Sequence, residues 1–263
     1  MSSLSLSLSL SLPGPARRAA FGQIVLNEAR LARRQPASLI AGVVMPVVLL
    51  VIFGAIPSFR QPAADLGGLT ALDVYVPILI VLSLGLLALF GLPMPLTTYR
   101  ELGVLRRLST TPVPPWWLLA AQSVVQLCVA LTGIAIILVM SITFYGVHVP
   151  KSPGALMLSI ALTAAAVFPM GLLIASVAKT ANGASVIGRL LLFPMIFFAG
   201  LWWPRELMPG VLQAVSNFTP LGAAVEAMQD SMQGQFPPAA PLLVLAAYAL
   251  VFGFLAKRFF RWE

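Results

Sequence analysis

Charge-free, largely apolar stretches alternate with short charged segments along this chain. Stretches without Asp, Glu, Lys or Arg cover residues 35–59, 74–99, 109–147, 152–178, 190–204 and 231–256. A helix that crosses a bilayer needs about 20 mostly apolar residues. The pattern therefore predicts an all-α membrane protein with six spanning helices. The first is expected near residues 39–56, the third at 117–144 and the fifth at about 184–204, and the second, fourth and sixth within residues 74–99, 152–178 and 231–256.

The fifth of these spans is the shortest, because only residues 190–204 are free of charge. It reaches a spanning length if it starts near Ala184 and Arg189 snorkels to the interface from the cytoplasmic end. Without this span the basic C-terminus would face the opposite side from the other basic segments. We therefore expect the span to exist, with Arg189 at one end of it.

The distribution of basic residues predicts the orientation. With the N-terminus inside, thirteen of the sixteen Lys and Arg residues flank the helices on the cytoplasmic side, and only Arg60, Lys151 and Arg205 lie outside. Short cytoplasmic loops of membrane proteins carry an excess of Lys and Arg. Both termini are therefore expected to be cytoplasmic.

Two further segments are predicted outside the spans. Residues 19–35 place Phe21 on one helical face with other apolar residues, and Glu28 and Arg30 give the segment a charged character, which favours a helix lying in the cytoplasmic interface. A plain basic flank is the alternative. Residues 203–238 contain several prolines and helically spaced apolar residues, which favour two short re-entrant helices in the outer leaflet.

The Ser-Leu repeat before residue 19 is interpreted as a disordered tail over residues 1–18, followed by one membrane domain over residues 19–263.

Composition excludes several functions. Hydrophobic residues make up 59% of the chain and charged residues 9%, so the net charge of +8 is attributed to topology and lipid headgroups rather than to nucleic acid. No metal site is expected, because His148 is the only histidine and there is no cysteine cluster. The predicted span interiors hold no proton relay, and no phosphate-binding loop occurs, so any ATPase must be a separate chain.

The most highly charged segment lies between the second and third spans. Arg100, Glu101, Arg106 and Arg107 alternate with the apolar residues Leu102, Leu105 and Leu108, and prolines follow from Pro112 onwards. A short amphipathic helix on a proline elbow would transmit motion from a docked partner. A solvated, topology-setting loop fits the same residues, and the residues alone do not separate the two interpretations.

This loop resembles the first cytoplasmic loop of ABC-2 type permeases, the membrane subunits of bacterial drug, polysaccharide and lipid exporters. The resemblance rests on Arg100, Glu101, Gly103, Arg107, Leu108, Thr111 and Pro112. A second patch is similar to the last outer segment of the same family, with Gly200, Pro204, Pro209, Pro220, Leu221 and Glu226. Together with the six spans, the resemblance covers residues 19–263.

The resemblance implies an ATP-driven exporter of the bacterial inner membrane that moves a drug, an antibiotic, a lipid or a lipid-linked glycan. Two permease copies, or a copy and a paralogue, would work with two ATPase subunits that carry ATP and Mg, and this chain would be no enzyme. The ATPase-coupling residues would be Arg100, Glu101, Gly103, Leu105, Arg106, Arg107, Leu108, Thr111 and Pro112, with Glu101 pairing with a basic neighbour, next to the interfacial helix of Phe21, Glu28 and Arg30.

The resemblance also implies an outer gate at Gly200, Pro204, Pro209, Pro220 and Glu226, and a substrate path along Phe90, Phe193, Met195, Phe197 and Phe198. Those aromatic and Met side chains also suit plain packing. Two other functions stay open: a secondary carrier or channel that needs no ATPase, and a membrane enzyme built around His148.

Overall fold

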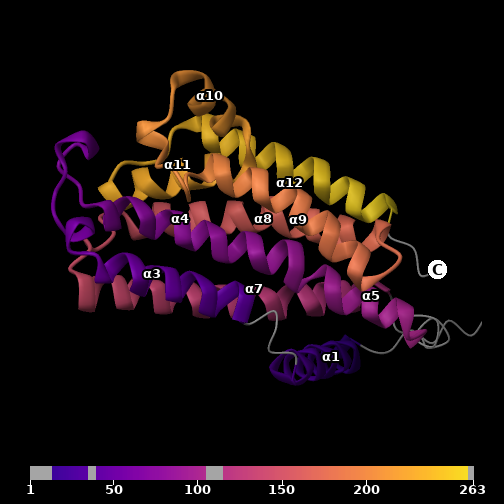
Figure 1. The fold of residues 1–263 in the computed structure, drawn as a ribbon. Coiled ribbons are helices and arrows are strands. Elements are labelled where there is room, and N and C mark those ends of the chain that lie inside the picture. The colour runs from indigo at the N-terminus through magenta and orange to yellow at the C-terminus, as the bar shows by residue number, and fades with distance from the viewer. Residues whose placement is uncertain (1–13, 35–39, 105–114, 260–263) are drawn as a thin grey trace, which may run out of the picture.

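A computed structural model describes residues 14–34, 40–104 and 115–259, and these residues are almost entirely helical (Figure 1). The helices are α1 (Gly14–Arg34), η1 (Ile40–Val44), α3 (Met45–Ala55), α4 (Ala71–Leu86), η4 (Leu87–Gly91), α5 (Pro93–Glu101), α7 (Pro115–Tyr145), α8 (Pro153–Val177), α9 (Ala181–Ala199), α10 (Gly210–Phe218), α11 (Pro220–Gln233) and α12 (Ala239–Phe259). Single 3-10 turns cover Pro57–Arg60, Ala64–Leu66 and Arg205–Leu207. Between Pro62 and Thr70 lies one isolated bridge, and no strand forms among the described residues.

Five helices in the described part of the chain are long and apolar enough to cross a membrane. They run over Ala71–Glu101, Trp116–Tyr145, Pro153–Val177, Ala181–Ala199 and Ala239–Phe259. These five confirm the second to sixth predicted spans as helices. The first apolar segment forms a shorter helix over Ile40–Ala55. A crossing of the membrane by this first predicted span, and with it the total of six, therefore stays a prediction.

The fifth predicted span differs from expectation in its position. Its helix, α9, begins at Ala181 after the N-cap residue Thr180 and ends at Ala199. The next residue, Gly200, has a φ of 94°, which lies in the left-handed region that glycine adopts freely. The helix therefore starts before Ala184 and stops before Pro204. Because of this shift Arg189 lies near the middle of α9, not at its end, which corrects the expectation from the sequence.

The long helices lie side by side, and their connections gather at two opposite ends (Figure 1). At one end, called here the basic end, lie the C-terminus of α5, the α8–α9 turn and the basic last turn of α12. The opposite end, called here the α11 end, holds α10, α11 and the α7–α8 loop, whose Lys151 and Ser152 amides donate to Met232 and Ser231 carbonyls. The alternation of ends along the chain agrees with a multi-pass bundle.

The second span occupies the centre of the bundle and carries a π turn. Nearly all of its side chains are buried. In the π turn η4 the Leu92 amide bonds the Leu87 carbonyl, five residues back, immediately before Pro93. A proline has no amide hydrogen to donate, and an extra residue in the turn accommodates the loss. The second span therefore contains a π turn directly before Pro93.

Two glycines bring neighbouring helices into contact with the π turn. A Cβ atom on Gly171 of α8 would lie 1.9 Å from the Ala88 carbonyl oxygen, and one on Gly188 of α9 would lie 2.7 Å from the Leu89 carbonyl oxygen. Only glycine permits such an approach of helix to backbone. From the α7 side, the Gln126 amide donates to the Gly91 carbonyl at 2.8 Å.

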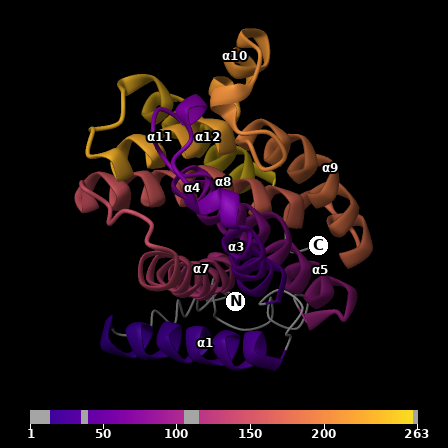
Figure 2. The ribbon, with the colours of Figure 1, turned by 60° about the vertical axis from the view of Figure 1, so that its left-hand side comes forward.

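Helix α1 lies across the bundle rather than along it (Figure 2). It packs on α7, where the rings of Phe21 and Trp117 meet edge to face with centroids 5.7 Å apart. This arrangement agrees with the expected interfacial helix. The helix begins at Gly14, earlier than the expected start at Ala19.

The two short helices expected within residues 203–238 are present as α10 and α11. Pro209 precedes α10, and Pro220 occupies the first turn of α11 after the N-cap residue Thr219. Helix α11 is buried along most of its length against α8, α9 and α4. The helices are confirmed, and their depth in a bilayer stays a prediction.

We expect Gly171→Ala to destabilise the bundle by about 1–3 kcal/mol, because its methyl group would collide with backbone at the π turn. Thermal unfolding of the detergent-solubilised chain measures the effect. Gly253→Ala on α12 is the matched control, since a Cβ atom there meets nothing within 4 Å. Equal unfolding midpoints for the two variants would contradict the packing described here.

Candidate functional site

Arg100, in the last turn of α5, caps the C-terminus of α8. Its guanidinium Nη1 donates to the carbonyl oxygens of Ala175 at 2.9 Å and Ala178 at 2.7 Å. The last carbonyls of a helix have no partner within that helix, and they carry the negative end of its dipole. The guanidinium of Arg100 donates hydrogen bonds to these carbonyls and places a positive charge at the negative end of the dipole.

Glu101, the next residue, caps the N-terminus of α9. Its Oε1 accepts the Ala181 amide hydrogen at 2.9 Å, and Thr180 Oγ1 accepts that of Gly183 at 3.0 Å. A carboxylate is favoured at the positive end of a helix dipole. The sequence suggested a basic partner for Glu101, whereas its hydrogen bond goes to the backbone of α9. Arg100 and Glu101 together hold the α8–α9 turn, and we call this pair the Arg-Glu clamp.

Gly103 ends α5 directly after the clamp. Its φ of 67° lies in the left-handed region, and its amide donates to the Arg100 carbonyl at 3.0 Å. Glycine at this position is a helix stop signal, which explains its place in the motif. Leu102 is 68% exposed beside it. Leu105, Arg106, Arg107, Leu108, Thr111 and Pro112 lie outside the described residues.

Tyr99 connects the same turn of α5 to α1. Its hydroxyl donates to Glu28, with distances of 3.0 and 3.2 Å to the two carboxylate oxygens. Burial raises the pKa of Glu28, and the hydrogen bond from Tyr99 offsets part of that rise. Arg30 is exposed on the same helix. Sequence reasoning singled out Glu28 but missed Tyr99, although Tyr99 directly precedes the motif.

Three consecutive residues of α5 therefore bond three different elements. Tyr99 bonds α1, Arg100 bonds α8 and Glu101 bonds α9. Successive residues on a helix point about 100° apart, so one turn can contact helices on several sides. Movement of this turn would be transmitted to all three elements at once.

A second polar cluster surrounds Arg205 at the α11 end. Arg205 is 4% exposed and donates to the Gly222 carbonyl at 2.7 Å, to Asn217 Oδ1 and to Glu226 Oε2 at 2.9 Å. Gly200 adjoins it, since a Cβ atom there would lie 3.2 Å from Arg205 Cγ. Glu226 was predicted as a gate residue, whereas Arg205 was counted only as a topology charge. The three gate prolines, Pro204, Pro209 and Pro220, flank the short helices of this cluster.

The predicted substrate-path residues do not share one surface. Phe193 is 60% exposed and stacks on Trp202 with centroids 6.3 Å apart, whereas Met195 is buried in the core. Phe90 is half-buried on η4, and Phe197 and Phe198 meet edge to face on α9. Only part of this set can therefore contact a molecule outside the subunit.

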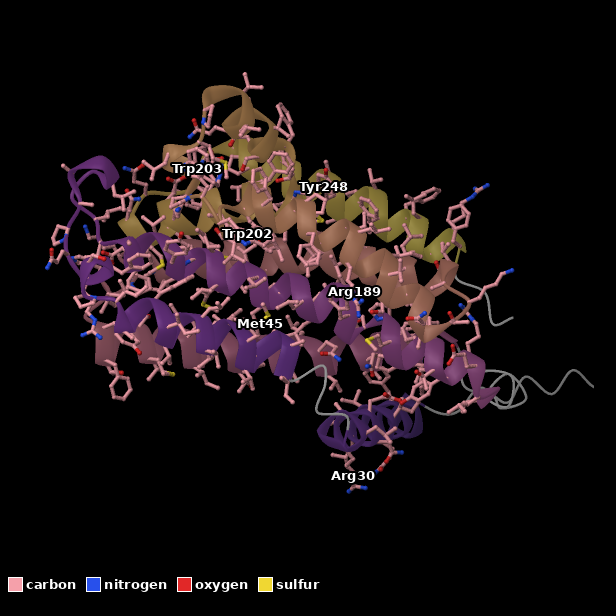
Figure 3. The ribbon with its side chains drawn as sticks, in the orientation of Figure 1. Arg30, Met45, Arg189, Trp202, Trp203 and Tyr248 are labelled. Atoms are coloured by element: carbon pink, nitrogen blue, oxygen red, sulfur yellow. The ribbon has the colours of Figure 1, made fainter. Side chains whose placement is uncertain are left out.

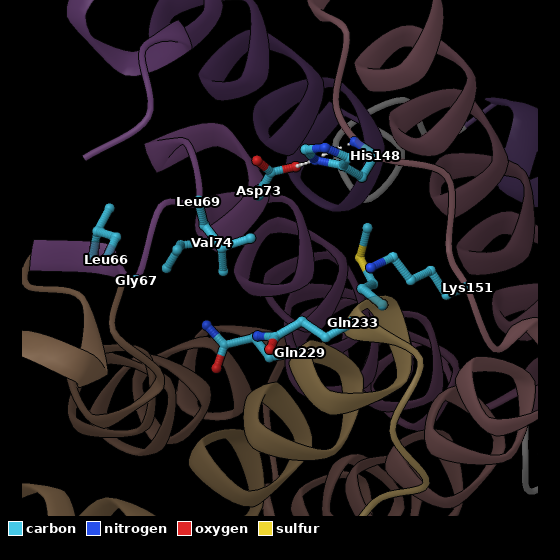
Figure 4. Close-up of a pocket in the computed structure, with 10 residues that line it drawn as sticks. Leu66, Gly67, Leu69, Asp73, Val74, His148, Lys151, Gln229 and Gln233 are labelled. Atoms are coloured by element: carbon cyan, nitrogen blue, oxygen red, sulfur yellow. Dashed lines mark hydrogen bonds and ion pairs between the residues drawn. The ribbon is translucent and has the colours of Figure 1, made fainter. Parts of the chain in front are cut away.

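A pocket of about 310 Å³ with a mixed polar and apolar lining opens at the α11 end between α4, α11 and the α7–α8 loop (Figure 4). His148 Nδ1 lies 3.0 Å from Asp73 Oδ1, and Thr70 also donates to Asp73 at the N-cap of α4. Of the nearby serines, Ser159 bonds Ala155 and Ala227 carbonyls instead. Among the described residues no serine bonds His148, and its two bonds to Asp73 connect the α7–α8 loop to the N-terminus of α4.

A central spanning helix, its clamped basic end and the folded segment at the opposite end characterise a multi-pass helical membrane protein. The model of the ABC-2 type transporter family matches residues 19–233, and the chain belongs to this family. It is also similar to a protein of Porphyra purpurea, ycf38, named as a transport permease. The two are 24% identical over 201 residues, which cover 74% of this chain and 68% of the relative.

We expect Glu101→Ala to loosen the N-terminus of α9. Loss of a capping acceptor costs about 1 kcal/mol, which corresponds to roughly fivefold faster opening. Hydrogen exchange of residues 178–183 measures the change. Lys179→Ala is the control, because Lys179 has no such bond within the described structure. Unchanged exchange in Glu101→Ala would contradict the clamp.

Glu28 predicts a pH dependence of stability. Because burial raises its pKa in the folded state above the ordinary value of 4.5, its contribution is fully present below pH 4.5 and is lost as pH rises through the higher pKa. The thermal unfolding midpoint of wild type should therefore fall more between acid and neutral pH than the midpoint of Glu28→Gln, which has no carboxyl group at this position. Parallel pH profiles for the two proteins would refute the prediction.

Proposed function

We propose that this chain is the permease subunit of an ATP-driven exporter that moves a hydrophobic or amphipathic substrate outward. Two copies, or a copy and a paralogue, would span a bacterial inner membrane with both termini in the cytoplasm. Two separately encoded ATPase subunits would bind ATP and Mg. Candidate substrates are drugs, antibiotics, lipids and lipid-linked glycans.

The observation that carries this proposal is the threefold attachment of one helical turn. Tyr99, Arg100 and Glu101 bond α1, α8 and α9 directly before the charged loop that begins at Leu102. Members of the ABC-2 family normally work with ABC ATPase partners. An ATPase that docks on the loop would thus move three elements through one turn of α5.

The docking residues we propose include the loop beyond Gly103, from Leu105 to Pro112, together with the exposed side of α1 around Arg30. The Arg-Glu clamp would serve as the lever behind this surface, because Arg100 and Glu101 are committed to backbone groups of α8 and α9. The docking surface and the lever are therefore assigned to neighbouring but different residues.

At the α11 end we propose that the Arg205 cluster and the two short helices form the exit gate, dipping into the outer leaflet. Arg205 is buried, and its ion pair with the partly exposed Glu226 connects α11 to the turn Arg205–Leu207. Loss of Glu226 would leave the buried guanidinium without its counter-ion, which is costly, so a gate built on this pair would move as one body. The substrate path would lie along the second and fifth spans. Of these two, α9 carries the exposed side chain Phe193, so we propose that α9 faces the second copy.

A secondary carrier or channel is the alternative function. A carrier would need a relay of acidic or histidine side chains within the spans for coupling, and the chain has no acidic residue between Asp73 and Glu101 or between Glu101 and Glu206. That pattern favours an external energy source. Solute flux through liposomes that contain only this chain would support the alternative.

The test is to purify the chain from its native membrane together with the proteins bound to it, and to measure ATP hydrolysis of the assembled complex. We expect Glu101→Ala to reduce the coupled hydrolysis rate at least fivefold while the complex still assembles, because the lever no longer holds α9. Lys179→Ala should behave as wild type. Wild-type hydrolysis in Glu101→Ala would refute the role of the clamp, and the absence of any ATPase in the purified complex would refute the exporter.

A further inference from the structure

Arg189 lies deep within a membrane-spanning helix. Helix α9 has 19 residues, which make it about 28 Å long, and Arg189 lies about 12 Å from its first residue. The hydrocarbon core of a bilayer is about 30 Å thick. Figure 3 places Arg189 between the two ends of the bundle. Snorkelling to the interface serves arginines near helix ends, and Arg189 is not near one.

The Arg189 side chain points out of the subunit. It is exposed, together with Val186, Leu190 and Phe193 on the same face of α9, while Gly188 and Leu192 are buried against the bundle. Within the described residues Arg189 has neither a hydrogen bond nor an ion pair. A guanidinium on this outward face therefore needs an acceptor from outside the subunit.

A second copy of the chain has no carboxylate to offer at this depth. No acidic residue occurs between Glu101 and Glu206, so α7, α8 and α9 contain none. The acidic residues that flank the second span, Asp73 and Glu101, lie at its two ends and bond local groups. Lipid chains offer no acceptor either. The missing anion must come from another molecule.

We propose that Arg189 binds the anionic headgroup, a phosphate or carboxylate, of an amphiphile in transit. A guanidinium presents a planar pair of donors that matches either group. The apolar part of the amphiphile lies along Leu190 and Phe193, which Trp202 extends by stacking. This inference rests on the proposed transport function and narrows its substrate class to anionic amphiphiles.

The experiment measures binding of fluorescent dodecyl phosphate to the full chain in neutral maltoside micelles by fluorescence anisotropy. We expect Arg189→Gln to raise Kd at least tenfold and Arg189→Lys to raise it less, because lysine keeps the charge without the paired donors. Arg258→Gln is the matched control. It removes an exposed arginine from the basic end of α12 and should change Kd less than twofold.

Equal affinity of wild type and Arg189→Gln would overturn the inference, as would displacement of the probe by inorganic phosphate at equal concentration. Native mass spectrometry before ligand addition separates a resident lipid from a ligand in transit. A phospholipid retained by wild type and absent from Arg189→Gln would overturn the transit role. The binding assay contains no ATPase and is therefore independent of the proposed function. If ATP hydrolysis of the assembled complex is coupled normally but Arg189→Gln binds the probe as wild type does, the exporter function stands and only the Arg189 site is refuted.

Discussion

The contact of α8 and α9 with the π turn of the second span is the constraint on which the rest of the bundle depends. Pro93 prevents a regular helical hydrogen bond, and the extra residue of η4 accommodates it. The carbonyls of Ala88 and Leu89 then meet Gly171 and Gly188, which have no side chain to keep them away. Proline and two glycines distant in sequence therefore fix the relative positions of three helices.

The clamp at the basic end follows from this packing. Because α8 and α9 lie against η4, the turn that joins them lies beside the C-terminus of α5, the helix that directly follows η4. Arg100 and Glu101 there satisfy the free carbonyls of one helix and a free amide of the next. Helix ends carry opposite partial charges, so a basic and an acidic residue in succession suit a turn between two helices.

Two arginines illustrate how the environment decides the role of a charge. Arg205 is enclosed at the α11 end and has three acceptors, so it holds the segment before α10 against α11. Arg189 lies on an outward face of α9 and has no acceptor among the described residues. The first charge is structural, and the second is available to another molecule.

Much of the architecture was predictable from local pattern. Apolar runs gave the helices of five spans, Gly103 and Gly200 mark helix ends by their left-handed backbone, and the prolines of residues 203–238 mark the starts of short helices. These features depend on neighbours within a few positions, where side-chain type directly limits the backbone. The interfacial helix α1 was found in the same way.

The sequence by itself determined the helices, their order and the concentration of basic residues between them. Only the tertiary structure decided that Glu101 bonds an amide 80 positions away, that Arg205 is buried, and that Arg189 lies in the middle of its helix. Hydrogen bonds between distant segments depend on the angle and depth at which helices pack. Those quantities are set by close approaches such as Gly171 on Ala88, which no local pattern encodes.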